Sequence, residues 1–237
     1  MFAISLLVPQ NILATDGLSE CQIGKEAADH FRSQYKVSTN KQVNEYVQNL
    51  GQKLVKNAPN RGFNYNFTVL DTNVENASAL PCGFVFVNTG LIKKVNDESE
   101  LVGVLAHEIA HAVKSHGMQN VRRTQKANRK LTAGRFGVAA LGIGSRIASA
   151  TGAGGVATVL GGAQSVGRLA YNGASLVTKG VLLKYGRDAE READLMGAEI
   201  MHKAGWNPIG LANYFSRDRS ALQVSALSTH PSSRERS

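Results

Sequence analysis

The amino-acid sequence predicts an α+β fold that is mainly helical and contains one small sheet. Apolar residues recur every three or four positions between Ser19 and Asn57, as they do on the buried face of a helix. Residues Phe63–Val69 alternate apolar and polar side chains, and Phe84–Val87 form a short apolar run, so both stretches predict strands. With 237 residues, of which 43% are hydrophobic and 19% charged, the chain is long enough to bury a core of ordinary composition.

Local sequence signals predict where the helices in the second half of this fold begin and end. The helix that contains "VLAHEIAHAV" begins after Asn96 or Asp97, either of which is a good N-cap, and acidic residues fill its first turn, where the helix dipole favours them. It is apolar on nearly every side, which indicates that it is buried. A later helix is expected from about residue 188 to 203, because Gly205 stops it and Pro208 is well placed to begin the next one.

We expect a single domain over residues 19–237, preceded by a short N-terminal segment. Residues 1–18 include an apolar run that is too short to span a bilayer; it resembles the apolar part of a secretory signal without the leading basic stretch. An export signal and a disordered N-terminus therefore both stay open. The two cysteines, Cys21 and Cys82, make neither a disulfide scaffold nor a cysteine-type zinc site. A bridge between them is compatible with an oxidising compartment, but their spacing does not require it.

Charged residues inside the buried helix indicate a metal site. His107 and His111 are four residues apart, so on a helix their imidazoles point to the same side and can bind one ion. Glu108 reaches the edge of that site and can take a proton from a water activated by the metal without being a ligand. Zinc lowers the pKa of such a water to about 7, which makes hydroxide available to attack a carbonyl carbon. Two structural core histidines are the alternative, but they would leave Glu108 charged and unpartnered in an apolar helix, which is costly.

A third protein ligand is needed, because catalytic zinc sites keep three protein ligands and one open position. Glu190 and Asp194 are four residues apart on the later helix and share a face. Glu190 is predicted to be the third ligand, and Asp194 to accept a hydrogen bond from His107, which would fix the tautomer of that ring. The alternative is an exposed helix whose acids neutralise nearby arginines. His116 is expected at the surface or behind a ligand, and Glu192 at the surface.

A basic insert rich in glycine and alanine separates these two helices, at about residues 118–186. From Ile109 to Arg187 the chain has twelve Lys and Arg residues and no Asp or Glu, and the formal net charge of the whole chain is +9. The insert is expected either to form small-residue helices over the metal site or to lie on an anionic membrane surface. Nucleic acid is not an expected partner, because aromatic residues that could stack on bases are almost absent from the insert.

These motifs resemble the zinc metallopeptidases grouped with HtpX, BepA and the CAAX prenyl protease, over nearly the whole chain. The similarity is to the peptidase domain of the soluble, BepA-like branch. "NASALPCGFVFVNTGLI" is similar to the family's strand before the motif helix, "HEIAH" to its zinc motif, "EREAD" to its third-ligand helix, and "HPSSRER" to its terminal His-Pro…Arg motif. The resemblance implies a gluzincin-type zincin fold with a small sheet edging the active-site cleft, and one zinc ion on His107, His111 and Glu190. Cys82 stands where the family usually has glycine.

The resemblance also implies roles for residues outside the zinc motif. His230 would be a switchable fourth ligand or a contact to the transition state, and Arg236, in the same terminal motif, would bind substrate. The cleft edge that pairs with an extended peptide would be the strand of Phe84, Val85, Phe86 and Val87.

We therefore expect a zinc-dependent endopeptidase in which Glu108 is the general base and then the proton donor. By resemblance, its substrates are unfolded or misassembled proteins of the cell envelope, and its location is periplasmic and peripherally membrane-associated. The alternative is a non-catalytic or latent metal-stabilised chaperone or binding module at the membrane surface, which would hold chains in its cleft without cutting them.

Overall fold

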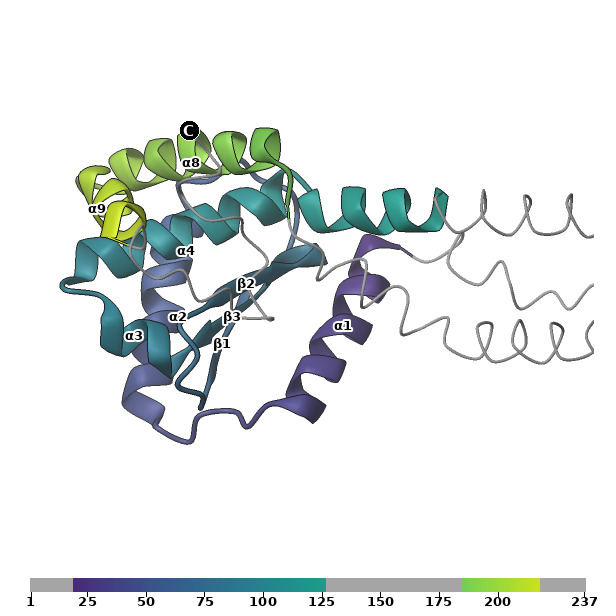
Figure 1. Cartoon of the computed structure of the whole chain (residues 1–237), viewed down its shortest axis with the longest axis horizontal. Helices are drawn as coiled ribbons and strands as arrows, with labels where there is room; N and C mark the ends of the chain where they lie inside the picture. The colour runs from purple at the N-terminus through teal and green to yellow at the C-terminus, as the bar shows by residue number, and fades with distance from the viewer. Residues whose placement is uncertain (1–18, 127–184, 218–237) are drawn as a thin grey trace, which may run out of the picture.

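The computed structural model describes residues 19–126 and 185–217 (Figure 1). Residues 116–126 form a helix directly after the motif helix, α4. The fold is α+β and mainly helical with one small sheet, as the sequence predicts. In chain order the other elements are α1 (Glu20–Gln34), α2 (Lys41–Val55), β1 (Asn66–Leu70), β2 (Ala77–Leu80), the 3-10 helix η2 (Pro81–Gly83), β3 (Phe84–Asn88), α3 (Thr89–Lys94), α4 (Glu98–Val113), α8 (Arg187–Lys203) and α9 (Ile209–Arg217).

The helical region predicted for residues 19–57 consists of two helices, and a polar side chain starts each of them. The Ser19 hydroxyl accepts a hydrogen bond from the Gln22 backbone N–H at 3.2 Å, and the Gln22 side chain accepts one from the Ser19 N–H at 2.7 Å. This reciprocal pair is a capping box and satisfies two backbone donors at the start of α1. At the start of α2, the Asn40 side chain accepts from the Val43 N–H at 3.2 Å.

The three strands form a mixed sheet in the order β1-β3-β2. β3 runs parallel to β1, with Phe67 opposite Val85, and antiparallel to β2, with Ala79 opposite Val85. The strand predicted over Phe63–Val69 begins three residues later, at Asn66. Neither β2 nor the short α3 was predicted; the sequence of β2, Ala-Ser-Ala-Leu, contains none of the β-branched or aromatic residues that favour strands.

The edge position predicted for Phe84–Val87 is wrong. These residues lie in β3, the central strand, whose backbone is paired with a neighbour on each side and is therefore closed to an extended peptide. Within residues 19–126 and 185–217, the edge strands are β1 and β2. The outer side of β1 already meets the segment before α2, where the Ser38 N–H donates to the Val69 carbonyl oxygen at 2.8 Å. β2 is the edge strand that packs against α4, so peptide pairing beside the motif helix would fall to β2.

The sheet separates two apolar clusters. Val85 and Val87 of β3 point to the face that packs against α2 and α4. The alternate residue Phe86 points to the opposite face, where it packs with Ile23 and Phe31 of α1, and the Phe31 and Phe86 ring centroids are 4.9 Å apart. In Figure 1 the sheet accordingly lies between α1 on one side and α2 and α4 on the other.

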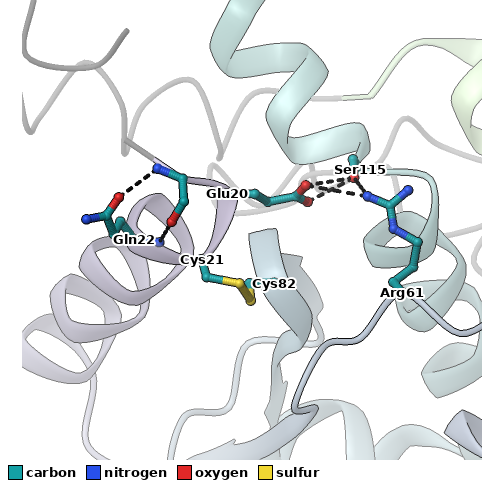
Figure 2. Close-up of a disulfide and its surroundings, with 7 residues drawn as sticks. Glu20, Cys21, Gln22, Arg61, Cys82 and Ser115 are labelled. Carbon is teal, nitrogen blue, oxygen red and sulfur yellow. Dashed lines mark hydrogen bonds and ion pairs between the residues drawn. A yellow bond between two sulfur atoms is a disulfide. The ribbon is translucent and has the colours of Figure 1, made fainter. Parts of the chain in front are cut away.

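A disulfide joins Cys21 of α1 to Cys82 of η2, with the Cα atoms 4.8 Å apart (Figure 2). The sequence left this bridge open. The turn between β2 and β3 is tight, because Cys82 and Gly83 both adopt positive φ angles, of 64° and 81°. A Cβ at Gly24 would lie 2.0 Å from the Pro81 carbonyl oxygen, so only glycine allows α1 to approach this turn so closely. The bridge and the close approach together hold α1 against η2.

Several sequence-based predictions concern residues outside the described ranges. They are the N-terminal segment 1–18, most of the basic insert, and the terminal motif with His230 and Arg236. Within residues 19–126 and 185–217, no helix combines the length and the apolar character that a bilayer span requires.

Candidate metal centre

The motif helix α4 is buried over most of its length and carries two histidines into the interior. Asp97 is its N-cap and accepts from the Glu100 N–H at 3.0 Å, which settles the choice between the two predicted caps. His107 and His111 lie one turn apart and are 0% and 1% exposed. Their Nε2 atoms face each other at 3.0 Å. Glu108, between them in sequence, is 1% exposed.

Helix α8 brings the third predicted ligand to this pair. Glu190 lies in the first turn of α8 and is fully buried. Its Oε2 is 3.5 Å from His107 Nε2, and its Oε1 is 3.6 Å from His111 Nε2. The approach of the two helices depends on Gly197, because a Cβ there would lie 3.1 Å from the backbone nitrogen of His107.

These three side chains form a group that could hold one metal ion. One ligand atom from each of them lies within 4.8 Å of the others. Around a tetrahedral zinc ion with ligands at about 2.1 Å, neighbouring donors are about 3.4 Å apart. The observed separations of 3.0, 3.5 and 3.6 Å lie on either side of that value. A divalent cation would also offset the charge of the buried Glu108 and Glu190 carboxylates. The residues therefore fit a metal site.

Asp194 lies one turn beyond Glu190 on α8 and contacts the outer side of the His107 ring. Its Oδ1 is 2.9 Å from His107 Nδ1. A carboxylate can only accept, so this contact favours the tautomer of His107 with its proton on Nδ1, which would leave the Nε2 lone pair on the side of Glu190. The sequence predicts a hydrogen bond between these two side chains, and they lie within the distance that one requires.

His116 is buried behind His111. The sequence left open whether His116 lies at the surface or behind a ligand. It is 2% exposed, and its Nδ1 lies 2.8 Å from His111 Nδ1. Its Nε2 lies 3.1 Å from Glu192 Oε2. Glu192 is at the surface, as expected, with a side chain 53% exposed, but its contact with His116 was not predicted. Burial lowers the pKa of His116, and the neighbouring Glu192 opposes that shift only in part.

A break in the helix brings His116 back toward the site. α4 ends at Val113, Ser115 adopts a positive φ of 53°, and the next helix begins. In an unbroken helix, side chains five residues apart would be rotated by about 140° and would not meet. The Ser115 hydroxyl donates to the Glu20 carboxylate at 2.9 Å and accepts from Arg61 Nη2 at 3.1 Å (Figure 2). The sequence gives no sign of this break, because serine, unlike glycine or asparagine, is uncommon in the left-handed region.

Two aromatic rings pack on the two histidines. Tyr185 stacks on His111 with ring centroids 4.0 Å apart and an interplanar angle of 16°. Its hydroxyl donates to the Ala79 carbonyl oxygen of β2 at 3.3 Å, and burial raises the pKa of this hydroxyl above its ordinary value. Phe215 of α9 lies against His107, with centroids 5.1 Å apart. Neither ring could be assigned from the sequence, because both are distant from the motif helix along the chain.

A buried group of two histidines from a His-Glu-x-x-His helix and a glutamate from a second helix defines the class of protein: a metallopeptidase. The model of peptidase family M48 matches residues 41–237, and the chain belongs to this family. The match confirms the predicted family and the predicted enzyme class, a metalloendopeptidase.

Curated relatives show the same similarity. The putative beta-barrel assembly-enhancing protease of Vibrio cholerae is 28% identical over 194 residues, which cover 80% of this chain and 36% of the relative. The beta-barrel assembly-enhancing protease of Escherichia coli (strain K12) is 22% identical over 217 residues, covering 90% of this chain and 41% of the relative. Metalloprotease YcaL of the same strain is 31% identical over 204 residues, covering 82% of this chain and 70% of the relative. The chain thus spans about two fifths, or less, of the length of the two beta-barrel assembly-enhancing proteases.

Proposed function

We propose that the chain is a zinc-dependent endopeptidase that cleaves unfolded or misassembled proteins of the cell envelope. His107, His111 and Glu190 would hold the zinc ion. The observation that carries the proposal is the convergence of these three buried donors, at separations of 3.0 to 3.6 Å, with Glu108 beside them on the motif helix.

When bound, zinc would act as a Lewis acid that polarises the scissile carbonyl and lowers the pKa of the attacking water to about 7. The side chains of the protein do the rest. The Glu108 carboxylate accepts the proton of the attacking water and returns it to the leaving amine. Asp194 keeps the proton of His107 on Nδ1. The rings of Tyr185 and Phe215 keep bulk water away from both histidines, which strengthens the electrostatic interactions among the charged groups.

The proposed substrate class and location rest on two observations. Several relatives are named as proteases that enhance β-barrel assembly, and β-barrels of this kind belong to outer membranes. The chain also contains a disulfide, and disulfides persist in oxidising compartments such as the periplasm. We place the protein in the periplasm, bound peripherally to anionic lipid through its basic insert. Flotation with anionic and with neutral liposomes tests the membrane part, and equal or absent binding to both would contradict it.

The closure of the site favours a second candidate, a latent form of the same peptidase. The metal-site residues are at most 1% exposed, and the Tyr185 hydroxyl is bonded to Ala79 on β2, the edge strand beside α4. A peptide that paired with β2 would have to displace this hydroxyl. His230 as a fourth ligand would contribute to the same latency, and a His230→Ala variant with unchanged activity would argue against that role.

The proposed mechanism is tested by Glu108→Gln in the full chain, with casein cleavage and zinc content measured on the same preparation. We expect the variant to keep its zinc and to cleave at least about 100-fold more slowly, because the amide cannot accept the proton of the water. Glu199→Gln is the matched control, since Glu199 is exposed on α8 and, among the described residues, pairs with Lys203 one turn away at 2.6 Å. Undiminished cleavage by Glu108→Gln would exclude Glu108 as the base.

A further inference from the structure

We propose that His116 and Glu192 are positioning residues that fix the tautomer and the orientation of His111 at the metal centre. The inference rests on the proposed function, because it takes His111 Nε2 to be a metal ligand. His116 lies on the other side of that ring: its Nδ1 is 2.8 Å from His111 Nδ1, and its Nε2 is 3.1 Å from Glu192 Oε2.

The direction of every hydrogen bond in this chain of three side chains follows from its outer end. The Glu192 carboxylate can only accept, so Nε2 of His116 donates to it. Nδ1 of a neutral His116 then accepts, and Nδ1 of His111 donates. His111 is left with its lone pair on Nε2, 3.0 Å from His107 Nε2 and 3.6 Å from Glu190 Oε1. The opposite tautomer of His111 would place a hydrogen atom where the metal has to bind.

His107 has a similar contact to a carboxylate, but without an intervening side chain. Asp194 contacts His107 Nδ1 directly at 2.9 Å, whereas His111 is reached through His116. Both carboxylates come from α8, which also supplies Glu190. One helix thus provides the third predicted ligand, the acceptor for His107 and the acceptor for His116, which in turn accepts from His111; such contacts to ligating imidazoles tune metal affinity.

The position of His116 is fixed by the surrounding structure. The left-handed Ser115 that turns the chain toward the site is held by Glu20 and Arg61. The His111 ring stacks on Tyr185, which restricts the orientation of the ring. The contact with His116 restricts the rotation that the stacking still allows. Glu192 is more exposed than Asp194, with side-chain exposures of 53% and 34%, so solvent weakens its effect.

The test measures zinc affinity by competition with a chromophoric chelator, and the visible spectrum of the cobalt(II)-loaded protein, in the full chain. His116→Gln places its amide near the former Nε2, where the NH2 group can still donate to Glu192, but it loses the contact to His111, so zinc should bind about 10- to 100-fold more weakly. His116→Asn places its oxygen near the former Nδ1, can still accept from His111, and should recover most of the affinity. Glu192→Ala removes the acceptor for His116 and should weaken zinc binding about 10-fold and shift the cobalt bands, whereas Glu199→Ala, at an exposed position of the same helix, should change neither.

Two results would overturn the inference, and they can be distinguished. Wild-type zinc affinity and an unchanged cobalt spectrum in His116→Gln and Glu192→Ala, with zinc binding lost in Glu190→Ala, would mean that the metal site is right but needs no such support. Undiminished zinc binding by Glu190→Ala would mean that the metal site itself is wrong. If His116→Gln fails to fold, Glu192→Ala alone decides, because that side chain lies at the surface.

Discussion

Removing the disulfide with the double substitution Cys21→Ser and Cys82→Ser is predicted to destabilise the protein by about 2–4 kcal/mol. The bridge closes a loop with a sequence separation of 61 residues. The chain-entropy relation for a loop of that length gives about 4 kcal/mol at 25 °C, as an upper value, and measured effects are commonly 2–4 kcal/mol. The apolar contacts that dock α1 on the sheet, through Ile23 and Phe31, stay in place. The loss should therefore be one of stability and not of fold.

The assay is urea unfolding of the oxidised wild type, the wild type in reductant, and the double serine variant. For a slope of about 2–3 kcal/mol per molar urea, the midpoint of the variant should fall by about 1 M. The reduced wild type is the control and should unfold with the variant. Coincident midpoints for all three proteins, or free thiols in the native wild type, would refute the reasoning.

Two further predictions concern the anchoring of α9 and the closed edge of β2. The Arg217 guanidinium, with help from the Asn96 N–H, holds the pKa of the buried Glu100 below its usual 4.5. Because the folded pKa is the lower one, Glu100 stabilises the fold fully above its unfolded pKa, and this contribution is lost as the pH falls through the folded value. Glu100→Gln should cost about 1–2 kcal/mol at neutral pH, moderated by the partial exposure of Arg217. Denaturation curves should show that difference shrinking below pH 4.5; a difference that stays constant on acidification would contradict the assignment. Tyr185→Phe keeps the stacked ring but removes the donor to Ala79. The KM for a peptide substrate should fall about 2- to 10-fold with little change in kcat; a raised KM would mean that the hydroxyl binds substrate.

The constellation around the metal site could be predicted because helical geometry connects sequence spacing to direction. Residues four apart share a face of a helix, so the spacing predicts that His107 and His111 face one side of α4 and that Glu190 and Asp194 face one side of α8. Helix ends could also be predicted, because capping depends on residues that are close in the sequence. The N-cap Asp97 is an example.

What could not be predicted depends on contacts between distant segments or on unusual backbone. Strand order is a long-range property, so the central position of Phe84–Val87 is not visible in a short apolar run. β2 owes its conformation to pairing and not to intrinsic propensity. His116 reaches His111 only because the left-handed Ser115 interrupts the helix. The disulfide likewise depends on the close approach of α1 to η2.

The proposed function depends on one zinc ion held by His107, His111 and Glu190. The most direct test is the metal content, by mass spectrometry, of wild type and Glu190→Ala purified without chelator. We expect about one zinc ion per chain in the wild type and a large loss in the variant, because the third ligand is removed. A wild type without zinc, or a variant that retains as much zinc as the wild type, would contradict it.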